Sequence, residues 1–190
     1  DEGITIEPNY VGSTPVLLNN RGTSLRLRAV ERYNKSVKLA DVSEKIAGFG
    51  AAKKDLLDAA ISHMQAWKMA TEAAATEIKD PVSAAKVMIP EYIKLEQDAA
   101  KKAEAMLIMA DLYRVAGDSV NAIVEYKKIL EATPESADAL AGVGLSLVNE
   151  GYVKDDKAML QEAANYLQKF VSVAPDTHKY KANAIEAIAT

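Results

Sequence analysis

Two stretches of the chain share the same order of small, bulky and proline positions. Residues 122–134 recur 41 positions later as residues 163–175, with alanine at the start of both stretches and proline at the end. The apolar segment before them, residues 106–113, recurs at the shorter offset of 34 as residues 140–147. The difference between the offsets places an insertion within residues 149–156. Periods in this range are typical of stacked repeats, in which each unit leaves an apolar face for its neighbour.

The composition favours helices along most of the chain. The 190 residues include 33 alanines but only 9 glycines and 6 prolines, and alanine is the strongest helix former. From Leu25 onward, apolar residues recur at three- and four-residue spacing, which is the pattern of amphipathic helices. These patterns predict helices over residues 24–41, 51–75, 82–89, 91–116, 119–132, 136–150, 155–173 and 177–189.

Proline, glycine and aspartate mark the expected helix ends. Asp80 followed by Pro81 predicts a helix start, because aspartate caps and proline fits the first turn. Pro90 is expected to interrupt a helix, since its ring disfavours helical geometry at the preceding residue. A long connection is expected through Gly48 and Gly50. Further boundaries are predicted at Gly117-Asp118, Thr133-Pro134 and Ala174-Pro175.

The repeated pattern resembles the tetratricopeptide family, whose 34-residue unit is a helix–turn–helix. The first match, over residues 103–136, rests on Met106, Met109, Ala110, Tyr113, Ala122, Tyr126 and Pro134. The second, over residues 137–177, rests on Leu140, Val143, Gly144, Leu147, Ala163, Leu167 and Pro175. The resemblance implies an all-α domain over residues 24–190, with helix hairpins stacked in a right-handed superhelix. Within it we expect a weaker repeat at 25–75, a helical insert at 76–102 and a capping helix at 177–189. A plain helical bundle is the alternative fold.

Residues 1–23 differ from the rest of the chain. Proline, glycine and asparagine interleave with β-branched residues there, which predicts an irregular, extended N-terminal arm with a short strand at most. A lone strand is marginal in water, so we expect the apolar side chains of the arm to dock on helices of this chain or of a second copy in a homo-oligomer. These side chains are Ile4, Ile6, Val16, Leu17 and Leu18.

In the resembled family, the first helix of each pair lines a concave groove that binds a protein or peptide segment. The corresponding positions here are Glu104, Leu107, Asp111, Arg114, Val115, Asp138, Ala141, Leu145, Val148 and Asn149. Some members hold a C-terminal carboxylate with lysine, asparagine and arginine at particular groove positions, and this chain has Leu107, Asp111, Ala141 and Leu145 there instead. The resemblance therefore implies a non-catalytic module for an apolar peptide or an amphipathic helix. The alternative is that these positions pack against the chain's own C-terminal helix.

The charge distribution and the motifs of the sequence make nucleic-acid binding, metal binding and catalysis less favoured functions than peptide binding. The net charge is −4 and the basic residues are dispersed, whereas nucleic-acid-binding proteins usually show a basic stripe. Without cysteine, the chain has neither disulfides nor thiolate zinc sites. His63 and His178 belong to no metal-binding motif, and we expect His63 to lie at a helix seam or in water. We therefore expect no enzyme activity, cofactor or metal, and a small-ligand-binding helical domain is the less favoured alternative.

The chain begins with Asp1 rather than Met, as expected after removal of an N-terminal segment. Removal of a signal peptide would make this an exported or periplasmic bacterial protein. In that setting a structural spacer within a larger exported assembly is the second functional alternative. No apolar run is long enough to span a membrane.

Overall fold

The computed structural model describes residues 14–69 and 76–189, which contain helices and no strands. The chain divides into two compact units, residues 1–116 and residues 117–190. The all-α prediction is confirmed for the described residues. The boundary between the units falls inside the predicted repeat 103–136, so the two helices of that repeat belong to different units.

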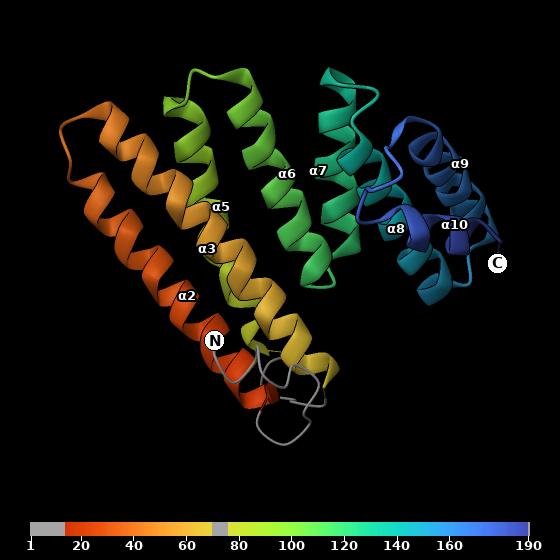
Figure 1. Ribbon diagram of the computed structural model, residues 1–190, viewed down its shortest axis with the longest axis horizontal. Coiled ribbons are helices and arrows are strands. Elements are labelled where there is room, and N and C mark those ends of the chain that lie inside the picture. The colour runs from red at the N-terminus through yellow and green to blue at the C-terminus, as the bar shows by residue number, and fades with distance from the viewer. Residues whose placement is uncertain (1–13, 70–75, 190) are drawn as a thin grey trace. The chain divides into compact units, whose positions relative to one another are not determined.

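The first unit is built around one long central helix. Helices α2 (Thr14–Val37) and α3 (Val42–Lys68) form an antiparallel hairpin, and α3 also packs against α5 (Lys79–Leu95) and α6 (Ala99–Val115) (Figure 1). Asp41 begins α3 by accepting the backbone N–H of Glu44 at 2.8 Å. Because α3 contacts every other described helix of the unit, its side chains position the polar groups discussed below.

The structure corrects the prediction of an extended arm. Residues 14–23 are the first turns of α2, and residues 1–13 lie outside the described part of the chain. Gly22, which suggested a turn, lies against the ring of His63, where a Cβ atom would come within 2.7 Å of the ring. Leu18 is buried and packs against Ala66 of α3, whereas Val16 and Leu17 are exposed. Close helix–helix contact, not chain reversal, therefore explains this glycine.

Two further boundary predictions are wrong. Gly48 and Gly50 lie inside α3, and Gly48 is in close contact with Ser36 of α2. The helix also continues through Pro90 to Leu95. Pro90 and Lys86, whose carbonyl loses its helical hydrogen bond to the proline, are both exposed, so water can replace the missing donor.

The second unit consists of α7 (Ser119–Ala132), α8 (Ala137–Lys154), α9 (Lys157–Val173) and the short α10 (Lys181–Ala189). Helix α7 has its predicted bounds, whereas α8 ends at 154 instead of 150 and α10 begins at 181 instead of 177. Gly117 has a positive φ of 79°, and Asp118 then caps α7 by accepting the backbone N–H of Asn121 at 3.2 Å. Helices α7 and α9 end just before the two predicted proline sites.

The inserted residues lengthen α8 instead of forming a loop. The helix continues to Lys154 and ends at Asp155, which has a left-handed φ of 52°. Asp156 follows at once as the N-cap of α9 and accepts the backbone N–H of Met159 at 3.0 Å. Two consecutive aspartates thus make the entire connection between α8 and α9.

Helix α8 contacts both of its chain neighbours through glycine. A Cβ atom at Gly142 would lie 2.3 Å from the ring of Tyr126 in α7. A Cβ atom at Gly144 would lie 2.5 Å from the side chain of Leu167 in α9. Ala163, the small residue of α9 at this crossing, has no exposed surface. Small residues therefore allow α8 to approach α7 and α9 closely within this unit.

Candidate functional site

The ten predicted groove residues are divided between the two units. In α8, Ala141 is buried, and Leu145 and Val148 are partly buried in the core cluster that also contains Ala184 of α10. Asn149 donates a hydrogen bond to Ser119 at 2.9 Å. These positions of α8 therefore lie in or beside the core that α8 shares with α9 and α10.

The charged residues of the set have polar partners, whereas its apolar residues in α6 are partly buried. Asp138 is exposed, and its carboxylate lies 3.4 Å from Nε2 of His178. In α6, Nη2 of Arg114 lies 3.4 Å from Oδ1 of Asp111. Leu107 and Val115 of the same helix are partly buried. The last member, Glu104, pairs with Lys53 of α3 at 2.9 Å.

A small cleft with a mixed polar and apolar lining remains open where α8, α9 and α10 meet. Its volume is about 260 Å³. Its lining residues come from all three helices and are Val148, Tyr152, Lys157, Leu160, Gln161, Ala164, Ala187 and Ile188. Aliphatic side chains form most of this lining, while Lys157 and Gln161 supply polar groups and Tyr152 is largely exposed. The cleft can accept an aliphatic side chain, and it falls below the roughly 300–1,000 Å³ typical of small-molecule pockets.

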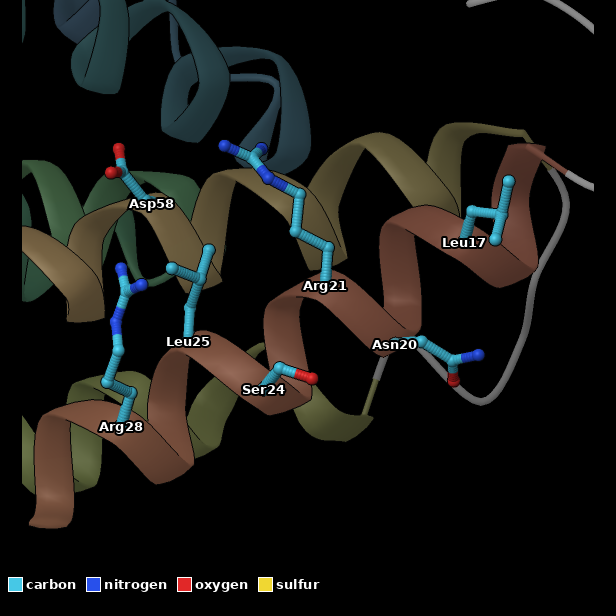
Figure 2. A pocket seen from close by; sticks show the side chains of 7 residues that line it. All are labelled: Leu17, Asn20, Arg21, Ser24, Leu25, Arg28 and Asp58. Carbon is cyan, nitrogen blue, oxygen red and sulfur yellow. The ribbon is translucent and has the colours of Figure 1, made fainter. Parts of the chain in front are cut away.

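A larger, polar cleft of about 500 Å³ lies along α2 and α3. Figure 2 shows Arg21, Leu25 and Arg28 extending from α2 toward the same side as Asp58 of α3. Leu17, Asn20 and Ser24 complete the lining. The cleft thus combines two guanidinium groups, two leucines and hydrogen-bonding side chains on one helix face.

Both arginines of this cleft are held in place by α3. Arg28 donates to the buried Asp55 carboxylate through Nε at 3.0 Å and Nη2 at 2.6 Å, and Arg32 donates to it through Nη1 at 2.6 Å. Arg21 donates from Nη1 to the hydroxyl of Ser62 at 3.0 Å. The hydrogen bonds to Asp55, and then its charge, raise the pKa of Arg28 above its ordinary value. These guanidinium groups are therefore fixed before any ligand arrives.

A third cleft, of about 410 Å³, is lined by small and apolar residues of α3 together with charged residues and Tyr92 from α3, α5 and α6. Lys53 is only 2% exposed and lies 5.0 Å from the centre of the Tyr92 ring. Tyr92 donates its hydroxyl proton to Glu96 at 2.9 Å, and burial is the main reason that its pKa is raised. Backbone N–H groups of Gln97 and Asp98 also bind Glu96, whose pKa they help to lower. This network serves to join the helices.

His63 is fully buried at the seam of α2 and α3, which confirms one of the two environments expected for it. Its Nδ1 lies 2.8 Å from Oδ1 of Asn19, whose amide group donates to Glu77 at 3.3 Å. This arrangement makes Nδ1 the protonated nitrogen, and Nε2 then faces Gly22 without a hydrogen-bond partner. Burial lowers the pKa of His63 and Arg26 adds to this, while Glu77 and Asp80 oppose it.

We expect the free energy of unfolding to fall as the pH is lowered below about 6.5. The unfolded imidazole takes up a proton near its ordinary pKa of 6.5, whereas the folded one does so only at lower pH. The slope due to His63 is at most about 1.4 kcal/mol per pH unit. Urea denaturation of the native chain and of His63→Gln across this range checks the prediction. Parallel pH profiles for the two proteins would contradict it.

No family model, curated protein or solved structure matches this chain. The candidate sites of the chain therefore rest on the contacts and burial of the described residues.

The part of the chain that the structure describes has no group of three or more histidine, aspartate or glutamate side chains arranged to hold a metal ion. Within residues 14–69 and 76–189, no helix has both the length and the apolar character needed to cross a membrane.

Sequence reasoning missed Arg21, Arg28 and Asp55. Arg21 fell within the predicted arm, and the partnership of Arg28 with Asp55 joins residues 27 positions apart. One signal was present, because arginines at positions 21 and 28 are seven residues apart and share a face of any continuous helix.

Proposed function

We propose that this protein is a non-catalytic interaction module that binds an amphipathic helix of a partner protein in the α8–α9–α10 cleft. The observation that carries the proposal is the way in which α10 itself is bound. This short helix packs on the α8–α9 hairpin through Ala184, Ala187 and Ile188. A surface that already accepts one helix continues beyond it as an open cleft, which aliphatic side chains line together with a few polar ones.

The chemistry of the cleft agrees with such an occupant. An amphipathic helix presents aliphatic side chains at three- and four-residue spacing, and the aliphatic lining offers a place for one or two of them. Tyr152 and Lys157 at the opening can contact the polar flank of the bound helix. The tetratricopeptide-like superhelix implied by the repeats forms part of the same proposal, because members of that family bind protein segments.

The test uses peptides selected by display on the full chain. Selected peptides are expected to carry aliphatic residues at three- and four-residue spacing. Ala164→Glu places a charged side chain in the cleft and is expected to weaken their binding at least about tenfold, or roughly 1.4 kcal/mol. Asn165→Glu introduces the same residue at the next position of α9, which is exposed and outside the lining, and serves as the matched control.

Equal effects of the two substitutions on peptide binding would refute the proposed site. Peptides without helical spacing of their apolar residues would refute the proposed occupant. Circular dichroism of both variants confirms that the helices remain folded.

A further inference from the structure

The charge of α2 is opposite to that of the whole chain. The helix carries Arg21, Arg26, Arg28, Arg32 and Lys35 against the single acid Glu31, while the net charge of the chain is −4. Two of these positive charges are matched one to one, since Lys35 pairs with Glu31 at 2.6 Å and Arg26 lies 3.6 Å from Asp80. Arg28 and Arg32 pair instead with an acidic residue of α3.

Arg28 and Arg32 share one carboxylate. Both donate to Asp55, so these three side chains together keep one surplus positive charge, and the Asp58 carboxylate also acts electrostatically on Arg28. Two of the five N–H groups of Arg28 are used by Asp55, and 52% of its side chain is exposed. A second carboxylate can therefore bind Arg28 without breaking its existing bonds. The geometry is prepared in advance, because Asp55 has already fixed the guanidinium.

Apolar and hydrogen-bonding groups extend the site along the helix. Leu17 is 39% exposed, Leu25 is partly buried, and Asn20 and Ser24 lie between them in the same lining. The cleft runs from position 17 to position 28, which corresponds to about 16 Å along a helix. An extended chain covers this length with about five residues.

We propose that the α2–α3 cleft binds a short acidic segment of a partner protein, with a carboxylate on Arg28 and an apolar side chain on Leu17 and Leu25. This is a second binding surface, separate from the one that the proposed function uses. A peptide suits it better than a nucleic acid, because Asp58 lies in the lining and would repel a continuous row of phosphates, whereas a peptide can place a carboxylate on Arg28 and an uncharged residue beside Asp58. The leucines give the segment specificity that charge alone would not supply.

Fluorescence anisotropy on the full chain tests this inference. The probe is a labelled peptide of roughly eight residues in which single leucines separate pairs of glutamates. A second peptide carries glutamine in place of every glutamate, and a third carries alanine in place of every leucine. A short single-stranded DNA is the competing polyanion. The glutamate–leucine peptide is expected to bind most tightly, and its affinity is expected to fall as salt is raised.

Matched substitutions localise the binding. Ser24 is exposed within the cleft, and the structure shows no contact that its replacement would break. Ser24→Glu is expected to weaken binding of the probe about fivefold and Ser24→Lys to strengthen it by a similar factor. Asn34→Glu and Asn34→Lys change the charge at an exposed position of the same helix outside the cleft, and they are expected to change affinity less than about twofold.

Several results would overturn the inference. They are the absence of probe binding, equal effects at positions 24 and 34, equal affinity for the glutamine peptide or for the alanine peptide, and tighter binding of DNA than of peptide. Ala164→Glu separates this inference from the proposed function, because it is expected to leave binding of the acidic probe unchanged. A chain that binds the acidic probe in the cleft but no helical peptide would refute only the proposed function.

Discussion

Replacing Phe170 by alanine is expected to lower the free energy of unfolding of residues 117–190 by about 3–5 kcal/mol. Phe170 has no exposed surface and lies in the core cluster formed by α8, α9 and α10. Its ring also meets the edge of His178, with 4.8 Å between the ring centres. The substitution leaves a cavity that rigid neighbouring helices fill only in part, so both apolar burial and packing contacts are lost.

Urea denaturation, combined with hydrogen exchange resolved by peptide, measures this effect in the affected unit. Val173→Ala is the matched control, because Val173 is on the same helix but 39% exposed, and it is expected to cost less than about 1 kcal/mol. Similar losses for the two variants would mean that the α9 core is not packed as described.

Asp55→Asn is expected to lower the free energy of unfolding by about 2–3 kcal/mol. The side chain of Asp55 is 6% exposed and accepts three hydrogen bonds from Arg28 and Arg32. Asparagine has the shape of aspartate but carries no charge. Its NH₂ group would replace one acceptor oxygen of Asp55 and would face the N–H donors of Arg28 and Arg32. The cost stays below that of a fully buried ion pair, because both arginines are more than a third exposed and water compensates them.

Asp58→Asn provides the comparison for Asp55→Asn. Asp58 is exposed and lies three residues later on the same helix, so its substitution is expected to change stability by less than about 0.5 kcal/mol. Thermal and urea unfolding of both variants measure the difference. A loss from Asp58→Asn as large as that from Asp55→Asn would show that the shared carboxylate is not what joins α2 to α3.

Sequence reasoning succeeded where neighbouring residues decide the structure. The chain ends helices at Gly117, Thr133 and Ala174 because left-handed glycine geometry and proline act within one or two residues. It failed at Gly22 and Gly48, whose missing side chains accommodate His63 and Ser36 from another helix. A glycine for a turn and a glycine for helix contact look identical in one sequence.

The candidate sites show the same division. The predicted groove residues of α8 do lie along one helix, but how far α10 would cover them depends on packing between elements. The sequence contains every charge of the α2–α3 cleft, yet only the fold makes Arg28 and Arg32 share Asp55. Whether residues so far apart in the sequence form an ion pair depends on which faces of α2 and α3 pack together.

The two glycine contacts of α8 also bear on how residues 117–190 come together during synthesis. Gly142 meets a residue 16 positions earlier and Gly144 meets one 23 positions later, so each contact closes a short loop at a low entropic cost. Helix α7 can pair with α8 while α9 is still inside the ribosome, and each later helix then finds a finished surface. Helix α10 is synthesised after α7, α8 and α9. The apolar surface of α8 and α9 on which its Ala184 packs is therefore uncovered until α10 has left the ribosome, and another amphipathic helix nearby can meet it first.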